Sequence, residues 1–217
     1  MPPEASRSGS RSSLFVTFEG GEGTGKSTQI ARLAARLKQR GIDPVVTREP
    51  GGTPLAEGIR ALLLDSGRRP GALAEAFLME AARAELVATV IRPALDQGRV
   101  VLCDRYDDST LAYQGAGRGL DAAMLRGWNR AATGGLEPDL TLLFDLDPAA
   151  GLARRAGAAE APNRLDREPA EFHARVRGRF LELAREQPGR WVVLDATRAP
   201  DRLEREVWTA VESRLTP

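Results

Sequence analysis

The stretch FEGGEGTGKST, residues Phe18–Thr28, decides the fold of this chain because it packs four glycines and one lysine into eleven positions. Gly20, four free positions, Gly25, Lys26 and Ser27 satisfy the pattern G-x-x-x-x-G-K-[ST]. This pattern is typical of a phosphate-binding loop, in which backbone N–H groups surround phosphate oxygens and the lysine reaches them. The alternative is a glycine-rich turn that merely precedes a helix.

The lysine of this stretch stands out because the chain holds only two, Lys26 and Lys38, while arginine fills the other cationic positions. An ammonium is a compact point charge and a guanidinium is a planar fork, so the two are not interchangeable. The apolar run Leu14–Phe18 before the loop predicts a buried strand, and apolar residues recur at helical spacing from Ile30 to Leu37. A strand, a loop and a helix in this order favour phosphate binding at the helix N-terminus.

Length and composition limit the number of domains, the location and the partners that the protein can have. The 217 residues are 42% hydrophobic, which predicts one domain over 13–217 behind a disordered tail at 1–12. The formal net charge of +1 makes nucleic acid a poor candidate partner. No apolar run is long enough for a membrane span or a signal peptide. The single cysteine, Cys103, predicts a small buried residue, and the absence of cysteine pairs favours the cytoplasm.

Four further apolar runs alternate with segments of helical periodicity. The helical segment Leu73–Leu95 is interrupted by Pro93. Strands separated by helices pair in parallel, with helices on both faces of the sheet. The sequence therefore predicts an α/β protein with a P-loop NTPase fold: a five-stranded parallel sheet flanked by helices, with a flexible lid. The four runs are Pro44–Thr47, Arg99–Cys103, Leu140–Phe144 and Trp191–Leu194.

Charged side chains follow these strands, at the sheet edge where ligands bind. Asp104 is predicted to hold Mg²⁺ opposite the hydroxyl of Ser27; Asp145 competes for this role, and either aspartate could instead cap a helix. Arg105 follows Asp104 directly and Arg48 ends the second strand. Two guanidinium groups at neighbouring strand ends match the geometry of one phosphate.

The chain offers few candidate general bases, since its one histidine, His173, is predicted to lie on the surface of a helix. A phosphate monoester oxygen is already anionic near neutral pH and needs no deprotonation. Phosphoryl transfer then depends on positioning and on charge neutralisation. The lack of bases favours a nucleoside monophosphate as acceptor over hydrolysis.

The segment ARRAGAAEAPNRLDRE, residues 153–168, carries arginines on both sides of a run of small residues. It predicts a lid at about 154–168 that closes over the donor and excludes water. A solvated loop between two helices is the alternative. Arg155, Arg164 and Arg167 are the candidates for contact with the transferring phosphoryl group, and the sequence does not choose among them.

Together these features resemble bacterial thymidylate kinases over nearly the full length after the tail. The segments that carry the resemblance are EGGEGTGKST, TREPGGTPLAEGIR, AARAE, DRYDDSTLAYQGAGRGLD, PDLTLLFDLDP and the arginine-bearing lid. The resemblance implies transfer of the γ-phosphoryl group of ATP to dTMP, with Mg²⁺, in dTTP biosynthesis. It also implies a homodimer formed through helices beside the active site.

The resemblance assigns roles residue by residue. It implies that Lys26, Asp104, Arg105 and a lid arginine, Arg155 or Arg164, are catalytic, and that Ser27 and Asp104 organise the metal. The ATP phosphates would lie on Gly20, Gly21, Glu22, Gly23, Thr24, Gly25, Lys26, Ser27 and Thr28. The dTMP site would comprise Glu22 at the 3′-hydroxyl, Arg48 and Arg105 at the phosphate, Arg83 at the thymine carbonyl, and Met79, Ser109, Tyr113 and Gln114.

Two features depart from the family pattern. Met79 occupies the position of a phenylalanine that stacks on thymine, although a thioether can still cover an aromatic face. The arginine run of the lid is broken by AGAAEAP. A kinase of another nucleoside monophosphate, such as dUMP, is the alternative enzyme. A regulatory nucleotide switch is a second alternative, but the D-x-x-G and N-K-x-D patterns that it needs do not occur.

Overall fold

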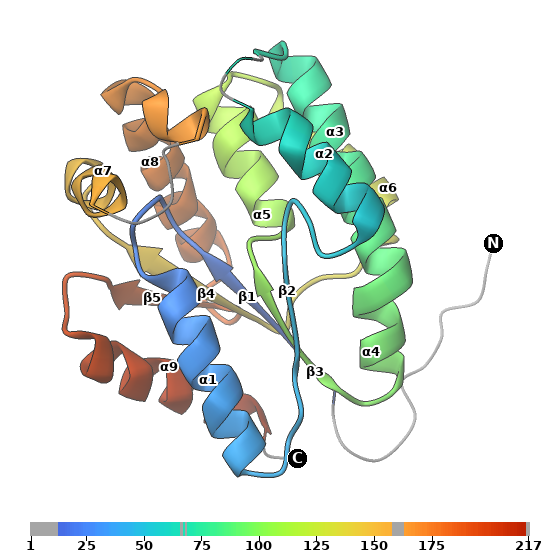
Figure 1. The fold of residues 1–217 in the computed structure, drawn as a ribbon, viewed down its shortest axis with the longest axis vertical. Helices are drawn as coiled ribbons and strands as arrows, with labels where there is room; N and C mark the ends of the chain where they lie inside the picture. Colours follow the sequence, from blue (N-terminus) through green and yellow to red (C-terminus); the bar gives the residue numbers. More distant parts are fainter. Residues whose placement is uncertain (1–12, 66, 68, 158–162, 216–217) are drawn as a thin grey trace.

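The structure, a computed structural model, describes residues 13–65, 67, 69–157 and 163–215. A parallel five-stranded sheet in the order β2-β3-β1-β4-β5 lies at its centre, which confirms the predicted architecture (Figure 1). Each strand ends one residue later than predicted, so the charged residue after each apolar run belongs to the strand. The strands are β1 (Leu14–Glu19), β2 (Val45–Arg48), β3 (Val100–Asp104), β4 (Leu140–Asp145) and β5 (Trp191–Asp195).

Helices cover both faces of this sheet. On one face lie α1 (Lys26–Gln39) and α9 (Pro200–Leu215), and on the other lie α4 (Arg92–Asp96) and α8 (Ala170–Glu186). The remaining α-helices are α2 (Pro54–Leu64), α3 (Ala72–Leu86), α5 (Asp107–Thr110), α6 (Ala122–Thr133) and α7 (Pro148–Ala156). Three short turns of other helix types are η1 (Val87–Ile91), η2 (Leu111–Gly117) and η3 (Leu165–Arg167).

The central strand β1 shows why two layers of helix are needed. Its residues Leu14, Val16 and Phe18 are buried against α1 and α9, whereas Phe15 is buried in a second cluster on the opposite face. Successive side chains of a strand point to opposite faces of the sheet. A strand that is apolar at every position therefore requires cover on both sides.

Pro93 does not interrupt the helical segment as its position in the sequence suggests. Residues 72–96 are helical throughout, with the π-helical turn η1 between α3 and α4. Pro93 lies in the first turn of α4, directly after the π-helical turn, where the hydrogen-bond register of the helix changes. The proline thus coincides with a local widening of the helix and not with its end.

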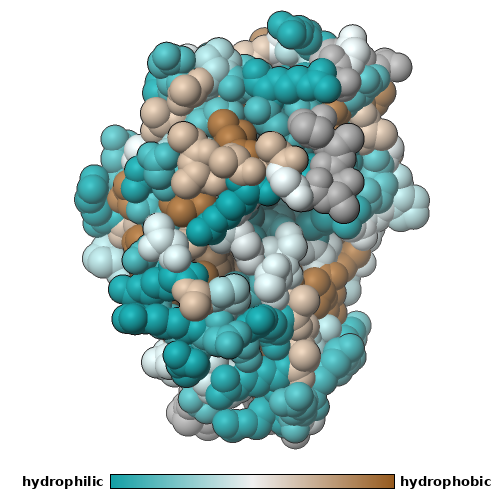
Figure 2. Space-filling model, turned by 60° about the vertical axis from the view of Figure 1, so that its left-hand side comes forward, coloured by the Kyte–Doolittle hydropathy of each residue, from teal (hydrophilic) through white to brown (hydrophobic). Residues whose placement is uncertain are grey.

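The surface in Figure 2 is mostly hydrophilic, with apolar residues in separate patches. Among the described helices, none combines the length and the apolar character required to cross a membrane. The predicted tail at 1–12 and the part of the predicted lid at 158–162 lie outside the described residues.

Candidate functional site

The phosphate-binding loop connects β1 to α1 at the carboxyl edge of the sheet. Positive φ angles require glycine at Gly20, Gly23 and Gly25 of this loop. Gly20 has φ 132°, and a Cβ there would lie 2.5 Å from the carbonyl oxygen of Phe144. Gly25 precedes α1 with φ 89°, a left-handed conformation that side chains disfavour. The chain can therefore form this turn tightly against β4 and leave the N-terminus of α1 open.

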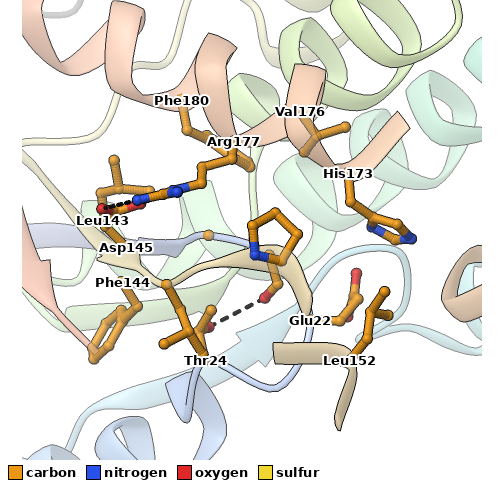
Figure 3. Close-up of a pocket in the computed structure, with 14 residues that line it drawn as sticks. Glu22, Thr24, Leu143, Phe144, Asp145, Leu152, His173, Val176, Arg177 and Phe180 are labelled. Carbon is orange, nitrogen blue, oxygen red and sulfur yellow. Dashed lines mark hydrogen bonds and ion pairs between the residues drawn. The ribbon is translucent and has the colours of Figure 1, made fainter. Parts of the chain in front are cut away.

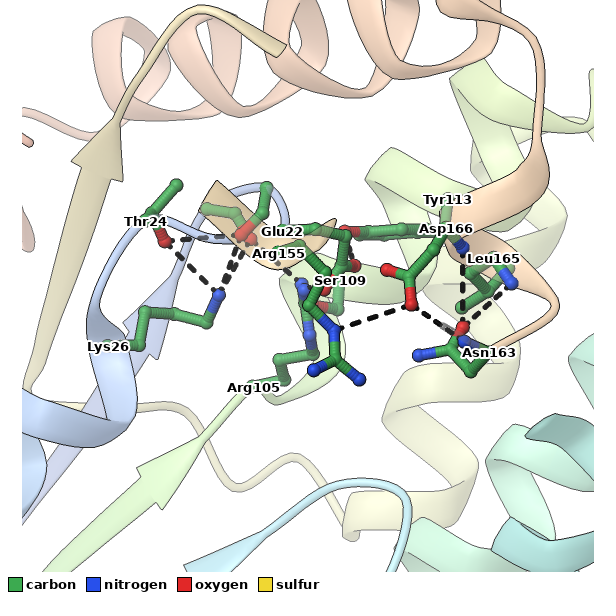
Figure 4. A network of polar contacts seen from close by, with 12 residues as sticks. Glu22, Thr24, Lys26, Arg105, Ser109, Tyr113, Arg155, Asn163, Leu165 and Asp166 are labelled. Atoms are coloured by element: carbon green, nitrogen blue, oxygen red, sulfur yellow. Dashed lines mark hydrogen bonds and ion pairs between the residues drawn. The ribbon is translucent and has the colours of Figure 1, made fainter. Parts of the chain in front are cut away.

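Lys26 folds back over its own loop (Figure 4). Its Nζ donates to the carbonyl oxygens of Gly20 and Gly21, at 3.1 and 2.9 Å, and to Thr24 Oγ1 at 3.4 Å. The side chain is buried, and burial together with the nearby Arg105 lowers the pKa of Lys26. The ammonium is thus held above the glycine loop, where the sequence pattern predicts phosphate oxygens.

Ser27 and Asp104 come together as predicted, because β3 ends beside the start of α1. Ser27 Oγ donates to Asp104 Oδ2 at 3.2 Å. Asp145, the competing candidate, instead accepts two hydrogen bonds from Arg177, at 2.7 and 3.0 Å. Among the described residues no group of three or more His, Cys, Asp or Glu side chains could hold a metal ion. The Ser27 hydroxyl and the Asp104 carboxylate are thus the two oxygen-bearing groups that meet at this place.

Arg105 joins the loop to the neighbouring cavity. Its backbone has φ 70°, which is uncommon for a residue with a side chain and is a form of strain found at functional sites. Its guanidinium donates to the carbonyl oxygen of Gly20 at 3.0 Å and to Glu22 Oε1 at 2.8 Å. Burial would raise the pKa of Glu22, but Arg105 and Lys26 outweigh it and lower that pKa to about 2. Glu22 is thus a permanent anion between two cations.

A cavity of about 100 Å³ opens beside Arg105. Tyr113 lines it and donates its hydroxyl hydrogen to Glu22 at 2.8 Å. Ser109 lines it as well, and its hydroxyl donates to the buried Glu19 at 2.6 Å. The structure thus gathers seven of the residues predicted from the sequence around one space: Glu22, Met79, Arg105, Ser109, Tyr113, Gln114 and Arg164.

Arg60, which the sequence reasoning did not assign, also lines this cavity. Its Nη1 donates to the carbonyl oxygen of Pro50 at 2.9 Å. Burial lowers the pKa of Arg60, and the positive charges of Arg48 and Arg105 lower it further. Arg48 itself is exposed and forms an ion pair with Glu57 at 2.9 Å, outside the cavity lining. The sequence places a cationic residue two turns into the helix that follows TREPGGT. This position was the feature of the sequence that could have identified Arg60 as a cavity residue.

Arg83 does not line the cavity, and its guanidinium has no free donor for the predicted contact with a base. The side chain is fully buried. Its guanidinium donates to Glu49, to Glu80, to Thr110 and Asn129, and to the carbonyl oxygen of Tyr106, over distances from 2.6 to 3.2 Å. These acceptors engage all three of its nitrogens. The residue lies on the buried face of α3 and ties α3 to the turn after β2.

Two of the three candidate arginines of the lid, Arg164 and Arg155, lie in different places. Arg164 is buried, where it donates to the carbonyl oxygen of Leu63 at 3.0 Å and to Glu75 at 2.5 Å. Arg155, at the end of α7, lies 3.4 Å from Asp166 and projects toward the space near Arg105 and Ser109 (Figure 4). Arg164 thus fastens the lid to α2 and α3, and Arg155 lies nearer to the phosphate-binding loop.

His173 is buried, so the prediction that it lies on a helix surface is wrong. It is 5% exposed and lines a second cavity of about 20 Å³ beside Glu22 and the loop (Figure 3). The error has a physical reason. His173, Val176 and Phe180 recur at helical spacing and form the face of α8 that packs toward the sheet. The neighbouring apolar residues were the signal that places the histidine inside.

The chain is similar to known thymidylate kinases, both by family model and by sequence. The family model described as "Thymidylate kinase" matches residues 18–207. The chain is 55% identical over 201 residues to the thymidylate kinase of Deinococcus radiodurans, covering 93% of this chain and 97% of that protein. It is 56% identical over 199 residues to the thymidylate kinase of Thermomicrobium roseum, covering 92% and 94%.

The fold agrees with these sequence matches. A crystal structure of thymidylate kinase from Ehrlichia chaffeensis superposes with a TM-score of 0.73 at 34% identity, covering 92% of this chain and 98% of that one. The match confirms the predicted P-loop NTPase fold. The family model spans residues 18–207, which include the loop, the cavity-lining residues and the lid, and the two relatives and the solved structure cover 92–93% of the chain. The chain therefore belongs to the thymidylate kinase family.

Proposed function

We propose that the chain transfers the γ-phosphoryl group of ATP to dTMP, giving ADP and dTDP. The observation that carries the proposal is the position of Arg105, whose guanidinium contacts both the carbonyl of Gly20 in the phosphate-binding loop and Glu22 at the cavity. A donor on the loop and an acceptor in the cavity would then meet at one cationic side chain. Such an arrangement suits the in-line geometry of phosphoryl transfer.

The donor side is supported by the loop and by Lys26. Backbone N–H groups at the start of α1 would hold the phosphates of ATP, and Lys26 would turn from its carbonyl partners to the β- and γ-phosphates. Mg²⁺ fits this place because hydroxyl and carboxylate oxygens are the ligands it prefers, with phosphates and water completing its coordination. Ser27 and Asp104 would hold it, and it would neutralise phosphate charge.

The acceptor phosphate is proposed to lie near Arg105 and Arg60, with Arg48 at the rim. All three arginines lie near the carboxyl end of β3 and the turn after β2. Guanidinium groups bind phosphate through paired hydrogen bonds and stay charged at all physiological pH values. The attacking oxygen of a monophosphate is anionic near neutral pH, so the described residues need not supply a base.

The base is proposed to lie between Met79 and Gln114. Gln114 donates through Nε2 to Glu75 at 2.8 Å, which leaves its Oε1 without a hydrogen-bond partner among the described residues. This oxygen would accept the N3–H of thymine. The same contact suits uracil, so dUMP remains the alternative acceptor. Arg83 has no role at the base in this proposal, because its donors are engaged by protein acceptors.

A panel of nucleoside monophosphates tests the proposal directly. ADP release would be measured by a coupled assay with ATP and Mg²⁺ and with dTMP, dUMP, dCMP, AMP or GMP as acceptor. We expect the largest kcat/KM for dTMP. Activity on AMP or GMP without activity on dTMP would contradict the proposal, and a preference for dUMP would replace the acceptor while keeping the mechanism.

Arg60→Met should raise KM for dTMP by at least tenfold and leave KM for ATP unchanged. The change removes one charged hydrogen-bond partner of the acceptor phosphate, a contact worth about 1.5–3 kcal/mol. Arg99→Met is the matched control, because Arg99 forms a partly exposed ion pair with Asp43 at the opposite edge of the sheet. An increase in KM for ATP alone would show that Arg60 faces the donor instead.

A homodimer is proposed through α2 and α3. Large apolar side chains are exposed on both helices, at Leu55 and Leu62 of α2 and at Leu73 and Phe77 of α3. The Phe77 ring lies 4.6 Å from the Trp128 ring of α6, centroid to centroid, so the apolar area extends across a third helix. Light scattering should give a molar mass twice that of the chain, and Phe77→Glu should give the monomer. A monomeric parent protein would contradict the proposal.

A further inference from the structure

Glu75 of α3 is a buried carboxylate on which two other segments converge, the turn η2 with its C-cap Arg118 and the lid. It is 1% exposed and lines the 100 Å³ cavity. Its Oε1 accepts from Gln114 Nε2 at 2.8 Å and from Arg118 Nε at 3.2 Å, and its Oε2 accepts from Arg164 Nη2 of the lid at 2.5 Å. Neither Glu75 nor these links has a place in the phosphate chemistry described above.

The chemistry of Glu75 fixes the orientation of the Gln114 amide. A side-chain amide has a donor end and an acceptor end that are nearly equal in size, so shape alone does not choose between them. An ionised carboxylate can only accept hydrogen bonds. The Nε2 of Gln114 must therefore face Glu75, and its Oε1 must face away; this oxygen is buried and has no partner among the described residues. Reversing the amide would place two acceptor oxygens against each other.

We propose that Glu75 is a positioning residue that sets base selection, by holding Gln114 as a hydrogen-bond acceptor and by tying that orientation to the lid through Arg164. The inference rests on the proposed dTMP kinase function. Thymine carries a hydrogen on N3, whereas cytosine has a lone pair there. A Gln114 that can only accept matches thymine and leaves two facing acceptors with cytosine, a mismatch that is costly in a buried site.

Glu75→Gln should lower the ratio of kcat/KM for dTMP over dCMP by at least tenfold. The substituted amide has nearly the size of the carboxylate but can donate as well as accept, so Gln114 becomes free to turn and to donate to cytosine N3. KM for dTMP should rise more than kcat falls, since the change acts on base binding. A ratio within threefold of that of the parent protein would overturn the proposal.

Two further variants separate this role from a merely structural one. Glu168→Gln removes the other carboxylate partner of Arg118 and Arg164, at 2.6 and 3.7 Å, but leaves the bond between Glu75 and Gln114. It should keep the dTMP over dCMP ratio within threefold. Glu75→Asp, which remains an obligate acceptor, should raise KM for dTMP while keeping the ratio. A tenfold loss of selectivity in either variant would contradict the proposal, and both measurements stand even where Glu75→Gln fails to fold.

Measurements on the parent protein separate a failure of the proposed function from a failure of the inference about Glu75. If it does not phosphorylate dTMP, the proposed function fails. If it phosphorylates dTMP and rejects dCMP, and Glu75→Gln keeps that selectivity, only the inference about Glu75 fails. Circular dichroism melting of each variant shows whether a lost activity reflects a lost fold.

Discussion

Replacing Lys26 by alanine should reduce kcat by about 10²–10³-fold, the effect of removing one donor aimed at developing charge, equivalent to about 2.7–4 kcal/mol. The ammonium lies over the loop that is proposed to bind ATP, within hydrogen-bond distance of three oxygens from that loop. Alanine cannot replace a charge that would follow the γ-phosphoryl group. Steady-state kinetics with saturating ATP and dTMP measures the loss.

The fold should survive this change. The hydrogen bonds lost go to loop atoms at the edge of the site, and removing a buried ammonium also removes its desolvation cost. We expect the melting temperature to shift by only a few degrees. Lys38→Ala is the matched control, because Lys38 is the other lysine of the chain and is 64% exposed in a long ion pair with Asp43. Turnover of Lys26→Ala within a few-fold of the parent value would remove the lysine from the mechanism.

Arg83→Met should destabilise the protein by about 3–5 kcal/mol, the usual result when one partner of a buried ion pair is removed. The fully buried guanidinium is within 2.8 Å of two buried carboxylates, those of Glu49 and Glu80. Methionine fills much of the same volume but leaves both acids without their cation. Urea denaturation followed by circular dichroism measures the loss. Arg126→Met, which alters an exposed pair with Glu186, should cost less than about 1 kcal/mol.

The loss in Arg83→Met should grow as the pH rises above about 7, because the folded parent protein and the folded variant both hold the Glu49 proton below that pH. Burial raises the pKa of Glu49 to about 7 even though Arg83 lowers it, so removal of Arg83 raises it further. Above about pH 7 the folded variant still holds a proton that the folded parent protein and the unfolded chain have released, so stability keeps falling with rising pH in the variant and levels off in the parent protein. A destabilisation that is equal at pH 5 and pH 8 would show that the carboxylates do not depend on Arg83.

The comparison of Arg83 with Arg60 shows where sequence reasoning reaches its limit. Both are arginines inside helices, at positions that the local sequence does not distinguish. Arg60 lies at the cavity and Arg83 lies in the core, because α2 and α3 turn different faces toward the end of β2. The difference depends on how helices pack over the sheet, and such contacts join residues far apart in the chain.

The position of His173 also depends on its surroundings, in this case within a single helix. Its polar character suggested a surface position, but the spacing of Val176 and Phe180 places it on the buried face of α8. Burial in this case followed from the apolar pattern around the residue and not from the residue type. The apolar spacing in the sequence therefore indicates a buried histidine at this position.

The sequence by itself determined the phosphate-binding loop, the five strands and the charged residues at their ends, because each depends on near neighbours. Glycine backbone freedom, the alternation of buried side chains and the spacing of Lys26 and Ser27 all act over a few residues. The tertiary structure alone decided the strand order β2-β3-β1-β4-β5 and the convergence of Gln114 and Arg164 on Glu75. These two residues lie 39 and 89 positions from Glu75, and only the packing of the whole chain brings their atoms within hydrogen-bond distance.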